Sequence, residues 1–314
     1  MKLLLLSNGR PGLLRSDDRV VDVSGAVPGV GQAAMQAIIE NFDALRGDLA
    51  RLEANGNAVP LSSVSLQAPL PSPHSIFCMG GNYSEFGHRA AAPMWGFHKS
   101  PEAVIGPGGT VVLPPDDANI FHHEPELVLV FSRGGKDIKA ADAFDHVFGY
   151  TGGIDVSARI YAGAPGGGGG PPRDSLPLSP AKSFNTFAPI GPWIVTRDEI
   201  ADPQDVHVRL SVDGQLRGDF RTSDMAHSIA ESIEFITSLE AVSAGDILYT
   251  GTNHQGLGAM QDGETIDLDV DGVGHLVVSV SDPQKRRWNK GVDEDTARDM
   301  REGTGPPGSK VRPF

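Results

Sequence analysis

Two glutamates stand two residues apart at the start of a long apolar run. The segment reads Phe121-His-His-Glu-Pro-Glu-Leu-Val-Leu-Val-Phe131, and the alternation of a β-strand would place Glu124 and Glu126 on one face. The run is apolar on both faces, which is typical of a buried strand. Two neighbouring buried carboxylates are costly unless a positive charge compensates them, so the pattern indicates a divalent cation. A solvated strand end is the alternative.

The ligand types bear on which cation this is. Carboxylate oxygens favour a hard ion, Mg²⁺ or Mn²⁺, with Ca²⁺ also possible. His122 and His123 keep zinc open, although the zinc motif His-Glu-x-x-His fails because residue 127 is leucine. A third acid, Asp155, follows a Gly-Gly pair and precedes Arg159 at helical spacing. Arg159 could bind a substrate carboxylate or pair with Asp155.

The elements that must position these acids are mostly short strands. Asp-Gly turns at 213–214 and 271–272 predict two hairpins, whose first strands are 206–212 and 265–270. A helix is expected near 229–239. Further strands are expected at 75–79, 110–113, 127–131, 193–196 and 247–250. The sequence therefore predicts a mainly β, α+β fold rather than a parallel doubly wound sheet.

The chain divides into three predicted regions. Residues 1–70 form a small N-terminal domain, with a strand at 20–23 and one amphipathic helix over 35–52 that Asn55-Gly56 ends. Residues 71–284 form the catalytic domain. Residues 285–314 are charged and rich in Gly and Pro, which predicts a flexible C-terminal tail. The glycine-rich stretch 162–172 lacks Gly-Lys-Ser/Thr and is interpreted as a mobile loop rather than a phosphate-binding loop.

Composition limits the classes of function. The chain has 314 residues and a net charge of −14, which disfavours binding to nucleic acid and to anionic membranes. The single cysteine, Cys78, lies in an apolar run and is interpreted as a buried hydrophobe rather than a nucleophile. We see no signal peptide and no membrane span, so we expect a cytoplasmic protein.

A series of short motifs resembles the fumarylacetoacetate hydrolase superfamily over about residues 75–282, in its 2-oxohept-3-ene-dioate isomerase and acylpyruvase-like branch. Each motif is weak alone, but their order is specific for the family. The series is Gly-Gly-Asn-Tyr (80–83), Phe-His-Lys-Ser-Pro-Glu-Ala-Val (97–104), His-Glu-Pro-Glu-Leu (123–127), Gly-Tyr-Thr-Gly-Gly-Ile-Asp-Val-Ser-Ala-Arg (149–159), Ala-Lys-Ser-Phe (181–184), Pro-Ile-Gly-Pro (189–192), Ala-Gly-Asp-Ile-Leu-Tyr-Thr-Gly-Thr (244–252), Gly-Leu-Gly (256–258) and Asp-Gly-Val-Gly-His-Leu (271–276).

This resemblance implies a mixed β-roll core, a homodimer, and one divalent cation per chain without an organic cofactor. It implies that Glu124, Glu126 and Asp155 hold the metal. Lys182 matches a lysine that the family places near metal and substrate. Tyr83, Arg159 and Thr252 lie in motifs that the family places around a substrate with adjacent oxo and carboxylate groups.

Two departures from the family pattern affect the expected catalytic residues. The family often carries Asn-Tyr-x-x-His-x-x-Glu, whose His and Glu form a catalytic dyad on a closing lid. Here Phe86 and Arg89 stand at those positions. We therefore predict that His88, two residues later, acts as base and that Glu85 orients it. Asn253 and His254 follow Thr252 where the family has Pro, and we predict that they contact substrate.

Three functions remain open from the sequence. The first is hydrolysis of a C–C bond in a 1,3-diketo acid, in aromatic-compound catabolism. The second is decarboxylation, hydration or isomerisation of a 2-oxo acid through an enolate on the same scaffold. The third is a non-catalytic or metal-independent relative. The first two differ in whether water is activated, which depends on the base.

Overall fold

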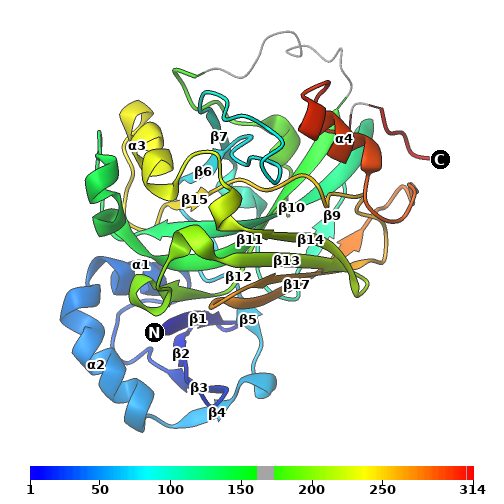
Figure 1. Cartoon of the computed structure of the whole chain (residues 1–314). Coiled ribbons are helices and arrows are strands. Elements are labelled where there is room, and N and C mark those ends of the chain that lie inside the picture. Colours follow the sequence, from blue (N-terminus) through cyan, green and yellow to red (C-terminus); the bar gives the residue numbers. More distant parts are fainter. Residues whose placement is uncertain (161–172, 309) are drawn as a thin grey trace.

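The computed structural model describes residues 1–160, 173–308 and 310–314 (Figure 1). The glycine-rich stretch 162–172 lies outside the described residues. The described strands form two sheets with helices at their margins, which confirms the predicted mainly β, α+β fold. In Figure 1 the N-terminal unit (blue) lies at one end of the molecule, and the C-terminal helix (red) lies near the other.

The larger sheet joins the N-terminal unit to the core. Its described strands follow the order β4-β3-β2-β1-β12-β11-β10-β15-β6-β7, with β5 beside β1 and β8 beside β12. Because β1 pairs antiparallel with β12, the sheet runs across the predicted boundary near residue 70. The bounds are β1 Lys2–Leu6, β2 Pro11–Leu14, β3 Arg19–Asp22, β4 Ala58–Pro60, β5 Leu66–Gln67, β6 Ile76–Met79, β7 Gly96–Lys99, β8 Val104–Ile105, β10 Ala118–Phe131, β11 Val147–Ile160, β12 Ala188–Thr196 and β15 Ile247–Tyr249.

Strands β10 and β11 form the centre of this sheet. Each is 14 residues long, and every residue of β10 is buried. The predicted strand at 127–131 is therefore the end of a longer strand that begins at Ala118. Burial on both faces explains the continuous apolar run, as the sequence indicated.

The smaller sheet packs against β10, β11 and β12. Its order is β14-β13-β16-β17-β9, with bounds β9 Thr110–Val112, β13 His207–Val212, β14 Gln215–Arg221, β16 Thr265–Val270 and β17 Gly274–Ser281. Asp213 and Gly214 have φ values of 50° and 76°, the left-handed pair that a two-residue hairpin turn needs. Both predicted hairpins are confirmed, because β13 pairs with β14 and β16 with β17.

The helices confirm one prediction and correct another. Helix α3 (Ile229–Leu239) forms as expected and begins with a capping box between Ser228 and Glu231. The single helix predicted over 35–52 is instead two, α1 (Gln32–Glu40) and α2 (Phe42–Asn55). The break falls at Asn41, whose side-chain amide donates to the carbonyl of Ala37 over 2.9 Å. Such local bonding of an asparagine competes with helix continuation.

The C-terminal segment differs from the flexible tail that its composition predicted. Helix α4 (Glu294–Glu302) forms there, and the Asp293 side chain caps its N-terminus. Trp288, Ala297 and Met300 are buried, and the Trp288 indole donates to the carbonyl of Asn119 over 2.6 Å. A few well-spaced apolar residues anchor this segment. The prediction of a flexible tail rested on the composition of all 30 residues, which conceals these few.

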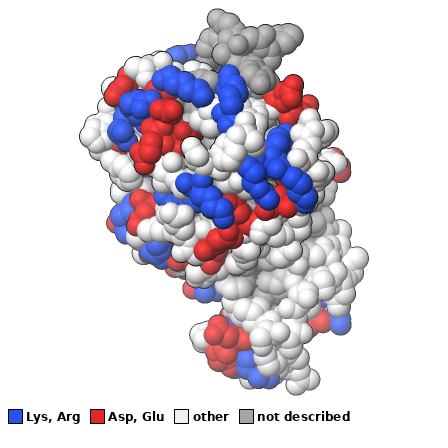
Figure 2. Space-filling model, turned by 90° about the vertical axis from the view of Figure 1, so that its right-hand side faces the viewer, with Lys and Arg blue, Asp and Glu red and all other residues white. Residues whose placement is uncertain are grey.

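Other global predictions meet different outcomes. Cys78 is a buried free thiol, and burial raises its pKa well above the usual value, which confirms the interpretation as a buried hydrophobe. On the face shown in Figure 2, Lys and Arg side chains are interspersed with Asp and Glu. None of the described helices has the length and apolar character that crossing a membrane requires.

Candidate metal centre and active site

Three carboxylates meet where β10 and β11 pair. The antiparallel register sets Glu124 directly opposite Asp155, while Glu126 faces Gly153. One carboxylate oxygen from each acid lies within 4.8 Å of the other two. Glu124, Glu126 and Asp155 are only 3%, 1% and 1% exposed. The structure thus brings together the three acids that the sequence singled out, and the alternative of a solvated strand end is wrong.

Three cationic side chains pair with this carboxylate cluster. The Lys182 ammonium donates to Glu124 over 2.6 Å and also to Asp155. The Arg159 guanidinium donates to Glu124. The buried Lys99 ammonium donates to Asp155 over 2.5 Å. Arg159 lies on strand β11, so the predicted helical spacing to Asp155 was wrong, and its partner is Glu124.

The two glutamates of the cluster have opposite electrostatic environments. Burial alone would raise the pKa of Glu124, but Arg159 and Lys182 outweigh it and hold that pKa well below the usual value. Burial, together with the charges of Asp155 and Glu124, raises the pKa of Glu126 well above the usual value. Glu126 also accepts the backbone N–H of Gly251 over 2.5 Å. An added positive charge would therefore be most stabilising beside Glu126.

The donor set fits a hard divalent cation. The group of potential ligands found among the described residues consists of three carboxylates and includes no histidine. His122 is committed elsewhere, because its Nδ1 accepts the Arg159 Nε–H over 3.1 Å. Oxygen donors of this kind suit Mg²⁺ or Mn²⁺, and the zinc alternative gains no support.

Metal affinity is expected to rise with pH. Glu126 has a raised pKa in the ion-free protein but must be ionised to bind a cation, so protons compete with the metal. Below that raised pKa, affinity should fall about tenfold per pH unit for one displaced proton. Titration calorimetry with Mn²⁺ over a pH series, in buffers of different ionisation enthalpy, measures both the affinity and the proton release. A pH-independent affinity without proton release would contradict the assignment of Glu126.

A buried histidine and glutamate face each other near the carboxylate cluster. Glu85 accepts from His254 Nδ1 over 2.7 Å, and its other oxygen accepts the His254 backbone N–H over 3.0 Å. The amide of Gln255 adds a third hydrogen bond, of 2.6 Å. Burial opposes ionisation of Glu85, but these interactions outweigh it and lower its pKa. His254 is also close enough to Glu124 to help lower the pKa of that acid.

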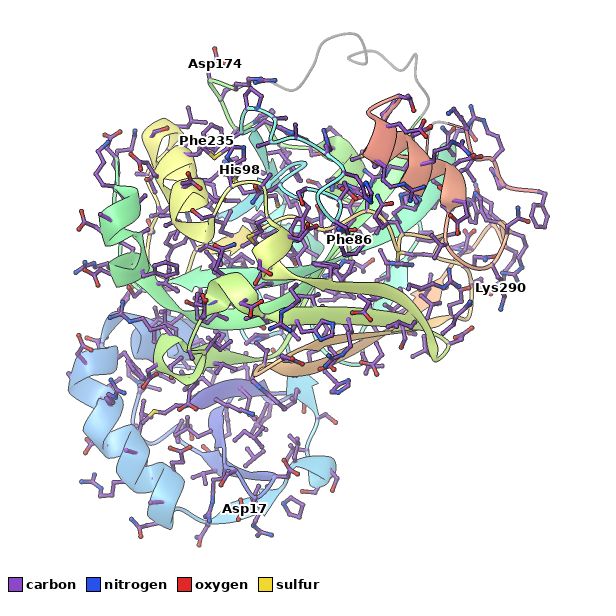
Figure 3. The ribbon with its side chains drawn as sticks, in the orientation of Figure 1. Asp17, Phe86, His98, Asp174, Phe235 and Lys290 are labelled. Carbon is purple, nitrogen blue, oxygen red and sulfur yellow. The ribbon has the colours of Figure 1, made fainter. Side chains whose placement is uncertain are left out.

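The conformation of one loop aims Glu85 at His254. Glu85 and Phe86 are non-glycine residues with φ values of 53° and 59°, in the left-handed region that such residues rarely adopt. Asp224 holds the loop, because it accepts from the Ser84 hydroxyl and from the Phe86 backbone N–H. Phe86, labelled in Figure 3, marks this loop. Glu85 itself is buried although Phe86 is exposed, and strain retained in a hydrogen-bonded loop of this kind is typical of functional sites.

The predicted pairing of Glu85 with His88 is wrong. His88 is exposed and is not among the residues that line the cavity beside the carboxylates. Its backbone N–H donates to the carbonyl of Glu85 over 3.3 Å, which closes a turn, and its side chain is exposed. Glu85 instead contacts His254, 169 residues further along the chain.

The other predicted substrate contacts divide into two groups. Arg159, Thr252 and His254 line the cavity beside the carboxylates. Tyr83 is fully buried against Phe220 and does not line it. Asn253 is also absent from the lining, and its amide donates to Asp224 over 2.7 Å. Asn253 therefore supports the loop that carries Glu85, because Asp224 accepts hydrogen bonds both from Asn253 and from that loop.

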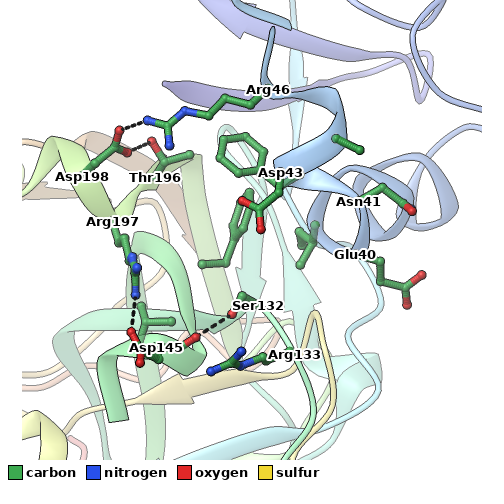
Figure 4. Close-up of a pocket in the computed structure, with 15 residues that line it drawn as sticks. Glu40, Asn41, Asp43, Arg46, Ser132, Arg133, Asp145, Thr196, Arg197 and Asp198 are labelled. Carbon is green, nitrogen blue, oxygen red and sulfur yellow. Dashed lines mark hydrogen bonds and ion pairs between the residues drawn. The ribbon is translucent and has the colours of Figure 1, made fainter. Parts of the chain in front are cut away.

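The cavity itself has a volume of about 260 Å³ and combines apolar and charged walls. Its lining residues are Met79, Gly80, Gly81, Arg89, Trp95, Phe97, Glu124, Glu126, Arg159, Lys182, Gly251, Thr252, His254, Met300, Gly305, Pro306 and Pro307. A larger hollow of about 470 Å³ lies where α2 meets the core (Figure 4). Two ion pairs take up four of its charges, Arg46 with Asp198 and Arg197 with Asp145, and among the described residues it lacks a carboxylate cluster like that of the smaller cavity, which is therefore the better candidate site.

Comparison with known proteins now places this arrangement in a family. The model of the family described as "Fumarylacetoacetate (FAA) hydrolase C-terminal" matches residues 75–281, about two thirds of the chain. The chain belongs to this fumarylacetoacetate hydrolase family. The family match contains the three carboxylates, Lys182 and both members of the Glu85–His254 pair. The C-terminal segment with α4 lies beyond it.

Relatives within the fumarylacetoacetate hydrolase family are enzymes of several kinds. The oxaloacetate tautomerase YisK of Bacillus subtilis is 35% identical over 230 residues, covering 69% of this chain and 73% of YisK. A maleylpyruvate hydrolase from Sphingobium sp. SYK-6, solved with Mn²⁺ and pyruvate, is 30% identical with a TM-score of 0.77, covering 90% and 99% of the two chains. A 5-carboxymethyl-2-hydroxymuconate delta-isomerase from Mycobacterium smegmatis is 31% identical with a TM-score of 0.68, covering 90% and 100%.

Proposed function

We propose that this chain is a divalent-metal-dependent enzyme that moves a proton between carbon and oxygen of a small 2-oxo dicarboxylic acid, as in keto–enol tautomerisation. The observation that carries this proposal is the His254–Glu85 pair beside the buried carboxylate cluster, in one small cavity. The similarity to an oxaloacetate tautomerase supports the same reaction class.

The chemistry follows from the roles that these groups can take. Glu124, Glu126 and Asp155 would hold the cation, which when bound would polarise the substrate carbonyl and so acidify the neighbouring C–H. Glu85 is ionised and accepts from His254 Nδ1, which leaves the Nε2 lone pair to take the carbon-bound proton. The same nitrogen then returns the proton to the enolate oxygen or to carbon. Glu85 stabilises the imidazolium between these two transfers.

A second carboxylate on the substrate is supported by Arg89. This residue lines the cavity, and its Nη1 is buried without a hydrogen-bond partner among the described groups. A buried unpaired guanidinium nitrogen is costly, and a ligand carboxylate would satisfy it through a charge-assisted bond. The family pattern has a glutamate at this position, so the present cavity carries an added positive charge.

Replacing Arg89 is expected to affect dicarboxylic substrates selectively. Arg89→Gln should raise KM for oxaloacetate roughly tenfold or more, the loss of one charge-assisted bond. KM for acetopyruvate, which lacks the distal carboxylate, should change little and serves as the internal control. Equal effects on both compounds would show that Arg89 supports the fold rather than the substrate.

The proposed function is tested by following the enol of oxaloacetate, which absorbs in the near ultraviolet. Purified protein with Mn²⁺ or Mg²⁺ should accelerate loss of the enol absorbance, and removal of the metal with a chelator should abolish the acceleration. Proton NMR in D₂O should show deuterium entering C3. If the metal-loaded protein does not accelerate loss of the enol, the proposal of tautomerisation is wrong.

Hydrolysis of a C–C bond remains a second candidate. The match to the maleylpyruvate hydrolase solved with Mn²⁺ and pyruvate covers nearly the whole length of that hydrolase. The same His254 nitrogen could take a proton from water instead of carbon, so the pair is compatible with either reaction. Release of pyruvate from acylpyruvates, measured with a coupled dehydrogenase, distinguishes hydrolysis from tautomerisation. A non-catalytic relative would show neither reaction, and a metal-independent relative would bind no metal.

A further inference from the structure

The C-terminal segment, described over residues 285–308 and 310–314, contacts the candidate site at several points, although it lies beyond the family match. Met300, at the end of α4, and the stretch Gly305, Pro306 and Pro307 form part of the cavity wall. The anchors of the segment are well defined, because Trp288 is 2% exposed and Asp293 donates its backbone N–H to Leu257 over 2.7 Å. The segment is thus a fixed part of the site's surroundings.

One chain of contacts runs from this segment to Arg159. Asp293 Oδ2 lies 3.3 Å from His122 Nε2, an electrostatic contact whose geometry is looser than that of a well-formed hydrogen bond. His122 Nδ1 accepts the Arg159 Nε–H over 3.1 Å, and the guanidinium then reaches Glu124. Because arginine only donates, Nδ1 must be unprotonated, so the ring proton sits on Nε2 and faces Asp293.

A second contact from the C-terminal segment holds the aliphatic stem of Arg159. Gly308 packs on the aliphatic stem of Arg159, where an added Cβ would come within 2.8 Å of its Cγ. The Gly308 N–H donates to the Thr296 hydroxyl over 2.7 Å, and its carbonyl accepts from Asn119 over 3.0 Å. The C-terminal segment therefore contacts the stem of Arg159 directly and its Nε–H through His122, whereas the contact with Glu124 is made by Nη2.

We propose that the C-terminal segment is a working part of the active site, in which Asp293 positions Arg159 through His122 for the substrate's 2-oxo acid group, and Met300 limits substrate size. This inference rests on the proposed function, since it assigns Arg159 to the substrate rather than to the metal. Asp293 is a positioning residue and Met300 a specificity-determining one. The family match alone would place neither in the site.

The helix itself supplies a matched pair of variants. Asp293→Asn keeps a residue that caps helices well but removes the charge that faces His122. Asp295→Asn, in the first turn of α4, makes the same chemical change at a residue whose side chain is half-exposed and pairs with Arg298. Both variants alter the charge at the helix N-terminus similarly, so a difference between them reports on the contact with His122.

The first measurement is the affinity of Mn²⁺-loaded protein for oxalate, a stable mimic of a 2-oxo acid enolate, by calorimetry. In Asp293→Asn the affinity should fall roughly tenfold, the usual scale for a lost partner behind a contacting residue. KM for oxaloacetate should rise similarly with kcat changed less, while Mn²⁺ affinity and Tm stay within error. Asp295→Asn should match the wild type. Wild-type affinity in Asp293→Asn would overturn the positioning role.

Two further measurements separate this inference from the proposed function. A crystal structure of Asp293→Asn should show the Arg159 guanidinium displaced from His122, whether or not any substrate is turned over, and an unmoved guanidinium would overturn the inference. Met300→Ala should shift the ratio of kcat/KM toward longer 2-oxo acids by several-fold, and an unchanged ratio would remove Met300 from the specificity wall. If wild-type protein neither binds oxalate nor turns over oxo acids, the proposed function fails instead.

Discussion

Glu124→Gln is expected to abolish divalent metal binding and to lower kcat/KM by roughly 10³-fold or more, since the loss removes several kcal/mol of transition-state stabilisation. The change preserves shape but removes one of three buried carboxylates whose ligand oxygens lie within 4.8 Å of each other. It also leaves the Lys182 and Arg159 cations without their shared partner, so they would repel an incoming cation. Metal content measured by mass spectrometry should fall from one ion per chain to none.

The control for this variant is the same substitution at another buried glutamate. Glu264 is 3% exposed, has a raised pKa through burial, and accepts the backbone N–H of Gln261, outside the cavity. Glu264→Gln should keep its metal, and its Tm should still rise on addition of Mn²⁺, because a ligand that binds the native state stabilises it. Retention of metal in Glu124→Gln would contradict the assigned ligand set.

The fold was largely predictable because its local patterns agree with its tertiary structure. The apolar run after Glu126 belongs to β10, which is buried on both faces, as an unbroken apolar strand requires. The turn at Asp213 and Gly214 was predictable because a two-residue hairpin turn needs two left-handed residues, a conformation that the Asp-Gly pair adopts readily. The break at Asn41 was missed because the apolar stripe continues across it, while a single side-chain hydrogen bond ends the first helix.

The site was predictable only in part, because strand register is not visible in the sequence. Alternation put Glu124 and Glu126 on one face, but the pairing of Glu124 opposite Asp155 depends on how β10 and β11 align. Lys99 was not assigned to the site, although the motif around Phe97 to Val104 contains it. Position in the chain gives no sign that it is buried against Asp155.

The identity of the histidine beside Glu85 shows the same limit more sharply. His88 was favoured because it is close in sequence, yet the left-handed turn at Glu85 and Phe86 points the carboxylate to the other side of the loop. On that side, Glu85 binds both the ring and the backbone N–H of His254, which fixes this histidine beside the carboxylate. The family often carries its histidine and glutamate on one loop, whereas in this chain Glu85 pairs with a histidine from a segment distant in sequence.

His254→Gln is expected to lower kcat by roughly 10²- to 10⁴-fold, the usual contribution of a positioned general base. Glutamine can still donate to Glu85 but cannot accept a proton, so metal content and Tm should remain close to those of the wild type. Glu85→Gln should give a smaller loss in kcat, because it leaves the imidazole in place but removes the charge that stabilises its protonated form. Single-turnover measurement of enol loss gives the rate constant of the chemical step, which shows whether the fall in kcat arises in that step.

His88→Gln is the matched control, since the same substitution is made at an exposed histidine on the loop that carries Glu85. It should leave kcat, KM and metal content unchanged if proton transfer belongs to His254. A large loss in His88→Gln with full activity in His254→Gln would instead restore the sequence-based assignment, and would require the loop to turn inward in the complex with substrate. Loss of activity in both variants would mean that each histidine transfers one of the two protons. Measuring deuterium exchange at C3 separately from enol loss would then show which histidine transfers the carbon-bound proton.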